Sequence, residues 1–336
     1  MLSHSVGSAS VTELGLGAAQ LGNLYHEVSE TDALLTVESA WDAGIRYFDT
    51  APHYGLGLSE WRLGHALAQF PRKDYVVSTK VGRRLVPSPA SAHRLDESFA
   101  VKATHKRVWD FSRDGIRRSL DDSLTRLGLD HVDIAYLHDP DEHWAEASTS
   151  GVGALVELRD EGVVRAIGVG MNSSGMLAEF VRQCDVDVVM VAGRYTLLDQ
   201  SAASDLLPLA LDRGVAVVAA GVYNSGLLST DRAAAGAMFD YGPAPDQLVE
   251  RANAIADICA RFGVSLPEAA IGFVLQHPAV VSVVLGARSA EQARANAARY
   301  EKSVPAQLWD ELRDAGIMVG PEANTPTASD SLAKGK

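Results

Sequence analysis

Four side chains that could exchange protons lie at or just after the ends of short apolar runs in the sequence. They are Asp49, Tyr54, Lys80 and His138. A free phenol has a pKa of about 10, so alone it exchanges protons poorly at neutral pH. A neighbouring ammonium stabilises the phenolate, a carboxylate keeps the ammonium charged and in place, and an imidazole can orient a substrate oxygen. Together these residue types suit proton transfer at an oxygen while a hydride moves at its carbon.

Each of the four residues also has an ordinary structural explanation when it is taken alone. An Asp after a strand is commonly a turn residue or a helix cap, and a Lys at a strand end is commonly a solvated charge. A lone His is more often a satisfied hydrogen-bonding group than a catalyst. The catalytic interpretation therefore depends on a fold that brings the four side chains to one place.

Apolar runs alternate with amphipathic segments along most of the chain. The expected strands are 13–22, 46–51, 75–82, 132–138, 165–171, 186–193, 215–221 and 281–286. The expected helices are about 31–43, 59–69, 112–127, 152–161, 174–183, 201–213, 246–262 and 289–298. Near-continuous apolar strands that alternate with helices are typical of a parallel sheet covered by helices. Eight such units favour an α/β fold of the closed, TIM-type (β/α)₈ barrel class.

The ends of the chain and two long connections complete the predicted architecture. A short β-hairpin is expected before the first barrel strand, at the bottom of the barrel. Residues 1–320 are expected to form a single barrel domain, and residues 321–336 a disordered tail. The connections 83–111 and 222–245 are longer than usual, which is typical of functional or mobile loops. Because the chemistry of such barrels sits at the C-terminal ends of the strands, the four residues are predicted to converge there.

Composition narrows the class of protein. The 336 residues carry a formal net charge of −13, which makes a nucleic-acid or anionic-membrane partner unexpected. Cys184 and Cys259 are the only cysteines, too few for a disulfide framework or a cysteine metal site, and the histidines lack tight ligand spacing, so no metal is expected. No apolar run approaches the roughly 20 residues of a membrane span. A cytoplasmic protein is expected.

Short motifs carry a resemblance to a known family. The strings DTAPHYG (49–55), STK (78–80), LHD (137–139) and GVGMN (168–172) resemble those of the aldo-keto reductases. The resemblance covers about residues 10–300. It implies a (β/α)₈ barrel that binds a nicotinamide cofactor and uses a catalytic tetrad of Asp, Tyr, Lys and His. The tetrad positions correspond to the four residues named above.

The same resemblance implies a set of cofactor contacts. Asn172 would meet the nicotinamide carboxamide, the loop 221–228 would cover the pyrophosphate with its backbone, and the segment 285–296 would hold the adenosine end. The implied contacts are Asn172, Gly221, Val222, Asn224, Ser225, Gly226, Leu227, Gly286, Ala287, Arg288, Gln292 and Asn296. Arg288 could pair with a 2′-phosphate or stack on adenine. The cofactor is therefore expected to be NAD or NADP, with a slight preference for NAD.

Two positions depart from the family pattern. Ala192 stands where much of the family has a Gln that supports the carboxamide, and Ala220 stands where an aromatic residue stacks on the nicotinamide. The departures leave the tetrad unchanged. They imply that other groups support the nicotinamide ring in this chain.

Longer phrases resemble one branch of the family. The segments 109–141 and 192–200 are similar to those of its sugar dehydrogenases, which oxidise aldoses such as L-fucose or D-threo-aldoses at C1, and of a close relative that oxidises pyridoxal. The resemblance implies oxidation of an aldose to its lactone, with Tyr54 as general acid/base and hydride transfer to nicotinamide C4. The expected walls of the substrate pocket are His53, Trp109, Trp144 and Met171. The two tryptophans could equally serve loop packing.

Other functions remain open from the sequence. Within the same chemistry, the chain could be a pyridoxal 4-dehydrogenase or a broad-specificity aldehyde reductase. A cofactor-binding regulatory subunit that senses redox state is a different class, and it predicts a long N-terminal arm or an obvious partner surface. A barrel with unrelated chemistry is a further alternative. The complete tetrad favours an enzyme acting on a small sugar or aldehyde.

Overall fold

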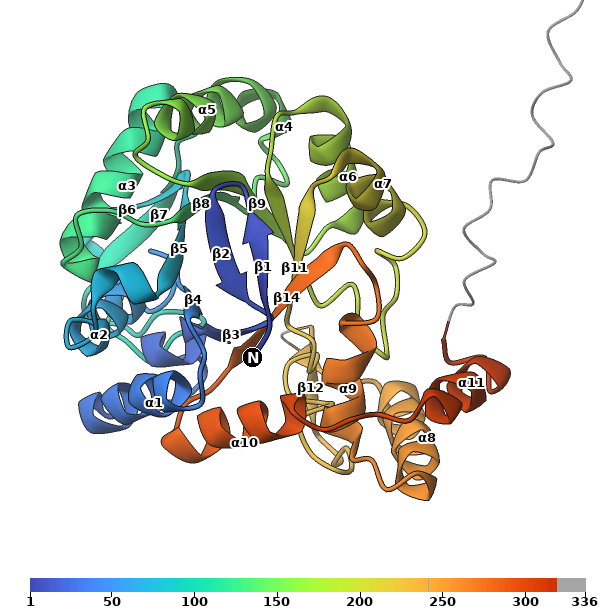
Figure 1. Cartoon of the computed structure of the whole chain (residues 1–336). Coiled ribbons are helices and arrows are strands. Elements are labelled where there is room, and N and C mark those ends of the chain that lie inside the picture. The colour runs from blue at the N-terminus through green and yellow to red at the C-terminus, as the bar shows by residue number, and fades with distance from the viewer. Residues whose placement is uncertain (241, 319–336) are drawn as a thin grey trace, which may run out of the picture.

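A closed barrel of eight parallel strands forms the centre of the molecule (Figure 1). The computed structural model describes residues 1–240 and 242–318. In barrel order the strands are β3 (Leu14–Gly17), β4 (Tyr47–Asp49), β5 (Val76–Val81), β8 (Ile134–His138), β9 (Ala166–Met171), β10 (Val188–Ala192), β11 (Ala216–Ala220) and β14 (Val280–Gly286). Strand β14 pairs with β3 and closes the ring. The predicted (β/α)₈ barrel and its eight strands are confirmed.

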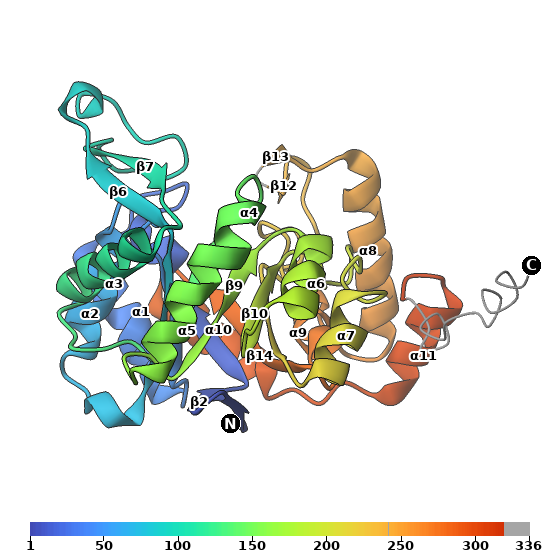
Figure 2. The ribbon, with the colours of Figure 1, turned by 90° about the horizontal axis from the view of Figure 1, so that it is seen from above.

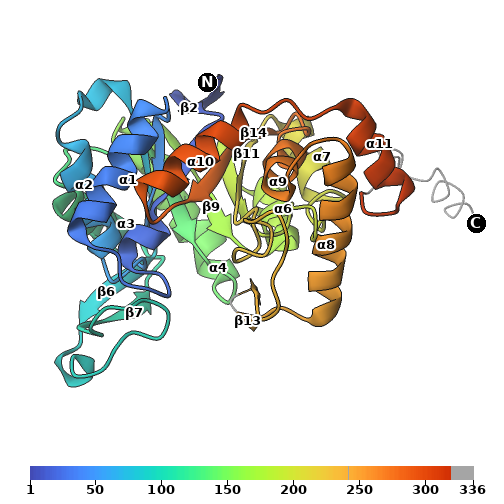
Figure 3. The ribbon, with the colours of Figure 1, turned by 90° about the horizontal axis from the view of Figure 1, so that it is seen from below.

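Helices surround the barrel. They are α1 (Glu30–Asp42), α2 (Leu58–Leu67), α3 (Arg113–Leu127), α4 (Trp144–Glu146), α5 (Val152–Asp160), α6 (Ser174–Gln183), α7 (Leu206–Arg213), α8 (Asp246–Arg261), α9 (Leu266–Val274), α10 (Ala290–Tyr300) and α11 (Ala306–Asp314). Short helical turns are η1 (Ala18–Gly22), η2 (Arg72–Asp74), η3 (Pro89–Ser91) and the π-type η4 (Ala147–Gly151). Helices α1 and α10 lie side by side (Figure 3), where Arg294 Nη1 donates to Ser39 Oγ at 2.9 Å.

Three helical predictions need correction. Helix α7 begins at Leu206, not at residue 201, because Asp199 accepts from the backbone of Ser201 and forms a turn there. Helix α9 was not expected, although Ser265 and Glu268 form a capping box at its start. Helix α11 lies beyond the last expected helix.

A hairpin of β1 (Ser3–Val6) and β2 (Ala9–Thr12) closes one end of the barrel, as predicted. Its buried residues Val6, Ala9 and Val11 pack with side chains from inside the barrel, among them Tyr47 and Ile134. Figure 2 shows this hairpin at the end opposite to β6 and β13. The long connections lie at the other end of the barrel, where the C-terminal ends of its strands are.

Each of the two long connections contains an antiparallel strand pair of its own. Strands β6 (Arg83–Pro87) and β7 (His105–Trp109) form a hairpin that projects beyond the C-terminal ends of the barrel strands (Figure 2). Strands β12 (Met238–Phe239) and β13 (Gly242–Pro243) form a smaller pair on the same side. The β6–β7 hairpin therefore stands beside the mouth of the barrel.

The domain boundaries stay a prediction. The barrel, its helices and the closing hairpin lie within residues 1–318, and the boundary expected at residue 320 lies outside the described residues. The expected disordered tail, 321–336, lies outside the described residues.

A glycine in α2 gives a test of the packing between helices. A Cβ added at Gly64 would lie 1.9 Å from the carbonyl oxygen of Leu127, at the end of α3. Because the atoms of Leu127 that the Cβ would meet are backbone, Gly64→Ala is expected to lower the free energy of unfolding by about 3 kcal/mol, measured by urea denaturation. Gly153→Ala in α5, where a Cβ meets nothing within 4 Å, should instead raise it by up to about 1 kcal/mol. Equal effects of the two substitutions would contradict this account of the α2–α3 contact.

Candidate active site

Strand alternation brings three of the four predicted residues into the barrel. Side chains of successive strand residues point to opposite faces, and Tyr47 and Tyr136 face the barrel interior. Asp49 follows Tyr47 by two positions, and His138 follows Tyr136 by two. Lys80 is the register partner of Tyr136. All three side chains therefore point inward at the C-terminal ends of β4, β5 and β8.

Lys80 and Asp49 form a buried ion pair. Lys80 Nζ lies 2.7 Å from Asp49 Oδ2 and donates to the carbonyl oxygen of Thr50 at 3.0 Å, and the two charged side chains are 2% and 4% exposed. Ser78 Oγ donates to the other oxygen of Asp49 at 2.7 Å. Burial alone would lower the pKa of Lys80, but Asp49 and the neighbouring Tyr54 raise it above its ordinary value. Lys80 is therefore a fixed positive charge.

A chain of hydroxyl groups continues from this pair toward the barrel centre. Tyr47 Oη lies 3.1 Å from Ser78 Oγ and 3.2 Å from Tyr136 Oη. Burial and Asp49 raise the pKa of Tyr47, and burial raises that of Tyr136, so both phenols stay protonated. Through Ser78, this network of hydroxyl groups fixes the Asp49 carboxylate on the side of the barrel centre. These residues were not among the predicted site residues, although their inward positions on the strands were visible in the sequence.

A tight turn carries Tyr54 to the ion pair. The backbone N–H of Tyr54 donates to the carbonyl oxygen of Ala51 at 3.1 Å, and Gly55 follows with φ of 62°. A Cβ at Gly55 would lie 2.3 Å from the carbonyl oxygen of Gly22 in η1, so only glycine allows this backbone contact. Lys80 Nζ lies 4.8 Å from the centroid of the Tyr54 ring. The turn thus places the phenol against the buried ammonium.

His138 completes the cluster. Its ring centroid lies 6.0 Å from that of Tyr54, and its Nε2 lies 3.5 Å from Asp139 Oδ2. Burial, and then the charge of Lys80, lower the pKa of His138 well below its ordinary value, so the imidazole is neutral. Its buried Nδ1 has no hydrogen-bond partner within residues 1–240 and 242–318. The structure therefore brings Asp49, Tyr54, Lys80 and His138 together, with an imidazole able to bond a ligand.

Residues of the β6–β7 hairpin, and of the loop between its two strands, cover this cluster. Phe99, from the loop between the two strands, lies 6.1 Å from the ring of Tyr54 and 5.2 Å from that of His53. Trp109 is 37% exposed, stacks with Arg83 at 4.7 Å and donates from Nε1 to the carbonyl oxygen of Asp139. His53 and Trp109 thus stand at the barrel mouth. Phe99 and Arg83 were not predicted, and the unusual length of the connection was the only signal for them.

Two expected pocket residues lie elsewhere. Met171, on β9, is 2% exposed and packs in the core between the barrel and the helices, so its side chain does not share the inward face of the tetrad. The cause is alternation, because Gly170 takes the inward position beside Lys80. Trp144 packs against Phe180 of α6, with ring centroids 4.7 Å apart. It borders a shallow hollow whose lining includes no tetrad residue.

The structure folds the loop after β11 into a compact turn. Gly221, Asn224, Ser225 and Gly226 all have positive φ, whereas the predicted contacts Val222 and Leu227 are buried in the core and anchor the loop. Asn224 Nδ2 donates to the carbonyl oxygen of Gly193 at 3.3 Å. Its buried Oδ1 has no hydrogen-bond partner among the described residues. Asn224 therefore offers an acceptor for a ligand, while Val222 and Leu227 could contribute only backbone groups.

The segment predicted for the adenosine end lies beside this loop. Tyr223 Oη donates to Asn296 Oδ1 at 3.2 Å, and Asn296 Nδ2 donates to the carbonyl oxygen of Gly286 at 3.2 Å. Gln292 Oε1 accepts from the backbone N–H of Arg288 at 3.0 Å, and Ala287 is buried. The bond between Tyr223 and Asn296, 73 positions apart in the sequence, thus ties the two segments together at neighbouring strand ends.

The barrel mouth between these segments and the tetrad suits a nicotinamide cofactor. Ala192 and Ala220 are register partners at the ends of β10 and β11, so two small side chains leave room there. Asn172 follows β9, and its carbonyl oxygen accepts from Arg194 Nε at 3.0 Å. A Cβ at Gly286 would meet the Gln20 side chain at 2.3 Å, and Gln20 Oε1 is buried without a partner among the described residues. These small residues and unpaired acceptors fit a large polar ligand.

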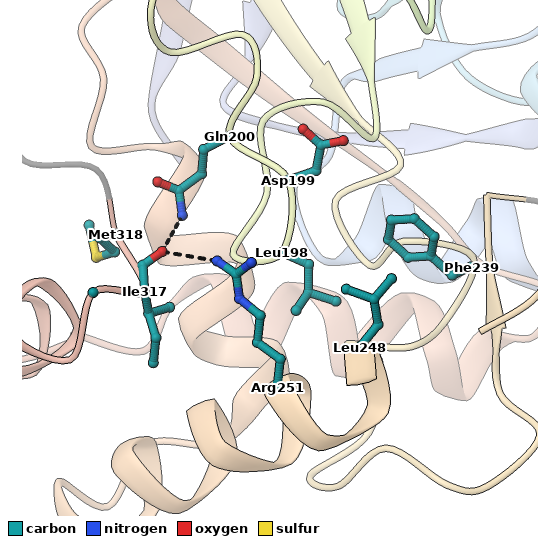
Figure 4. A pocket seen from close by; sticks show the side chains of 9 residues that line it. Leu198, Asp199, Gln200, Phe239, Leu248, Arg251, Ile317 and Met318 are labelled. Atoms are coloured by element: carbon teal, nitrogen blue, oxygen red, sulfur yellow. Dashed lines mark hydrogen bonds between the residues drawn. The ribbon is translucent and has the colours of Figure 1, made fainter. Parts of the chain in front are cut away.

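Another pocket lies away from the tetrad. It is bordered by the loop after β10, by α8 and by the residues after α11 (Figure 4). Gln200 Nε2 and Arg251 Nη2 both donate to the carbonyl oxygen of Ile317, at 2.8 and 3.3 Å. Its lining includes none of the four tetrad residues.

Within residues 1–240 and 242–318, no group of three His, Cys, Asp or Glu side chains could hold a metal ion. In the same residues, no helix combines the length and the apolar character that a membrane span needs.

Asp49, Tyr54, Lys80 and His138 meet at the mouth of a (β/α)₈ barrel, and residues 13–317 match the Aldo/keto reductase family, so the chain belongs to that family. It is a nicotinamide-dependent oxidoreductase acting on CH–OH groups. It is 47% identical to a D-threo-aldose 1-dehydrogenase from Pseudomonas sp., over 93% of this chain and 96% of that protein. It is 42% identical to a pyridoxal 4-dehydrogenase from Microbacterium luteolum, over 92% and 95%. The holo form of an aldo-keto reductase from Bacillus halodurans superposes with a TM-score of 0.74, at 26% identity, covering 97% of this chain and all of that one.

The two neutral imidazoles at the site predict an acid sensitivity of the fold. Burial, helped by Arg83 and Arg107, lowers the pKa of His53 to about 2, and His138 is also lowered. In the unfolded chain both take up a proton below about pH 6.5, so stability is complete above that pH and is lost as the pH falls below it. Each histidine should cost up to about 1.4 kcal/mol per pH unit, measured by urea denaturation between pH 7 and 5.5. His53→Phe should flatten this dependence; a wild-type stability that is constant over the range would contradict the prediction.

Proposed function

We propose that this protein oxidises an aldose of the L-fucose or D-threo-aldose type at C1, giving the lactone. The carrying observation is the buried Lys80–Asp49 pair, 2.7 Å apart, set against the ring of Tyr54. Identity of 47% with a D-threo-aldose 1-dehydrogenase supports an aldose as the substrate. The catalytic roles below are part of the proposal.

Tyr54 is the group that accepts the proton of the anomeric hydroxyl. The ammonium of Lys80 stabilises the phenolate that takes up this proton, and Asp49 keeps the ammonium charged and aimed. His138, which is neutral, orients the same oxygen through a ring nitrogen. A nicotinamide bound at the mouth supplies the acceptor for the C1 hydride. Together these groups remove the proton from the anomeric oxygen while the hydride leaves C1.

The cofactor is NAD or NADP, with NAD preferred. Its holders are Asn172, the loop from Gly221 to Leu227, and the segment from Gly286 to Asn296. Asn224, with its buried unpaired oxygen, supports this assignment. Arg288 lies at the start of α10, where it could face a 2′-phosphate or adenine, so NADP is retained as an alternative.

Oxidation of pyridoxal is the second candidate activity. Identity of 42% with a pyridoxal 4-dehydrogenase over nearly the full length supports it. A broad aldehyde reductase would use the same tetrad in the opposite direction.

The setting we infer is the cytoplasm, because Cys184 and Cys259 are both free.

An absorbance assay at the reduced-nicotinamide band tests the proposal. NAD⁺ and NADP⁺ are each offered with L-fucose, D-arabinose, L-galactose, other aldoses and pyridoxal. The expected result is reduction of the cofactor with at least one aldose at a higher kcat/KM than with pyridoxal. Turnover of pyridoxal alone would transfer the assignment to the second candidate, and turnover of no aldose would refute the proposal.

A further inference from the structure

The β6–β7 hairpin reaches the candidate site through a hydrogen bond to His53. Arg107, on β7, donates from Nε to His53 Nδ1 and from Nη2 to the carbonyl oxygen of His53 at 3.1 Å. The two residues are 54 positions apart in the sequence. Arg107 of the hairpin is therefore hydrogen-bonded to both the ring and the backbone of His53, the residue before Tyr54.

Arg107 is itself held by a buried carboxylate. Its Nη1 lies 2.5 Å from Asp96 Oδ2 and its Nη2 lies 3.1 Å from Asp96 Oδ1, a two-pronged pair. The backbone N–H groups of Ser98 and Phe99 also donate to Asp96, each at 3.2 Å. Burial alone would raise the pKa of Asp96, but these donors, Arg107 first, lower it. Asp96 therefore stays charged and fixes the direction of the guanidinium.

This arrangement sets the tautomer of His53. A guanidinium can donate hydrogen bonds but cannot accept them, so Nδ1 of His53 must be the acceptor. The neutral ring then carries its proton on Nε2. Phe99 packs edge-on against the ring at 5.2 Å and 89°, which fixes the ring plane.

The ring of His53 lies beside the groups proposed to act on the reacting oxygen. Its centroid is 5.6 Å from that of His138 and 6.0 Å from that of Tyr54. A donor here is within reach of an oxygen on an atom close to the reacting carbon. A site built to bond a substrate hydroxyl discriminates strongly against analogues that lack it.

We propose that Arg107, held by Asp96, is a positioning residue that fixes His53 as an Nε2–H donor to a second oxygen of a polyhydroxylated substrate. The hairpin thereby contributes to the choice of substrate without touching the reacting atoms. The inference rests on the proposed function, because it assigns a hydroxyl-bearing substrate to the same site.

The charges around His53 support a neutral donor. The facing titratable groups are Arg107 on β7, Arg83 on β6, Lys80 on β5, His138 on β8, Asp96 in the hairpin loop and Tyr54 in the same turn. Three of these are cations and one is an anion already paired with Arg107. A second proton on the imidazole would therefore be opposed by its surroundings.

Nitrogen-15 NMR of the full-length protein with labelled histidine tests the tautomer directly. The His53 signals are assigned by their loss in His53→Gln. In the wild type we expect the Nε2–H pattern from pH 6 to 8, and in Arg107→Met a mixture of tautomers or a titrating ring. Arg84→Met is the matched control, because Arg84 lies on the same hairpin but pairs with Asp110. An Nδ1–H tautomer in the wild type, or an unchanged pattern in Arg107→Met, would overturn the proposal.

Kinetics then test the role of the donor. Arg107→Met and His53→Phe should lower kcat/KM for the best aldose by about 10- to 100-fold, as expected for one lost hydrogen bond to the substrate. In both variants the loss should be clearly smaller for the reduction of benzaldehyde, which offers no hydroxyl, than for the best aldose. Equal losses on both substrates would contradict a bond to a second oxygen. Because the NMR measurement needs no substrate, a failure of aldose oxidation itself would be recognised separately.

Discussion

Replacement of Tyr54 by Phe is expected to lower kcat/KM for aldose oxidation by about 10³-fold. The substitution removes only the phenolic oxygen, which accepts the proton as phenolate, and the ring stays in place against Lys80 and Phe99. The dissociation constant of the nicotinamide cofactor should stay within about threefold of the wild-type value, since the ring is retained. Initial rates and a fluorescence titration of the reduced cofactor measure the two quantities.

Tyr300→Phe is the matched control for this substitution. Tyr300 lies on α10, outside the tetrad, and its hydroxyl donates to Glu13 at 2.6 Å. Turnover should therefore be unaffected by this substitution. Near-normal turnover in Tyr54→Phe would remove Tyr54 from the mechanism. Loss of cofactor binding together with turnover would point to damaged structure rather than to a missing proton acceptor.

Lys80→Met is expected to reduce both activity and stability. The variant leaves the Asp49 carboxylate buried and without its cation, which should cost about 3–5 kcal/mol of unfolding free energy at neutral pH. The phenolate of Tyr54 loses its neighbouring charge at the same time, so kcat/KM should fall by about 10³-fold or more. Urea denaturation and initial rates are the measurements.

The double variant Asp49→Asn/Lys80→Met separates the two effects. Removing both charges should recover a large part of the lost stability, because no unpaired charge stays buried. Activity should not recover. A double variant as unstable as Lys80→Met, or a single variant as stable as the wild type, would contradict the role given to this pair.

The barrel and the position of the tetrad were predictable because they depend on local patterns. Inward residues two apart on a strand, such as Tyr47 and Asp49, follow from alternation once the strand is recognised. The resemblance then matched these strand-end residues to the family's catalytic tetrad. Asp49, Lys80 and His138 needed only the knowledge that parallel strands of a barrel end at one face.

The contacts of the β6–β7 hairpin with the site could not be predicted in the same way. The contact between Arg107 and His53 joins residues 54 positions apart, and the connection that contains Arg107 has no strong periodicity of its own. Its hairpin forms because β6 and β7 pair with each other beyond the barrel. Met171 packs in the core between the barrel and the helices, because alternation along β9 directs that side chain outward.

Transfer of deuterium from the substrate tests the central claim most directly. L-fucose, or the best aldose found, is supplied with deuterium at C1 together with NAD⁺ or NADP⁺, and the products are analysed by NMR and mass spectrometry. The account predicts a lactone free of the label and one deuterium at C4 of the reduced nicotinamide. A reduced cofactor without deuterium, or no oxidation of any labelled aldose, would contradict it.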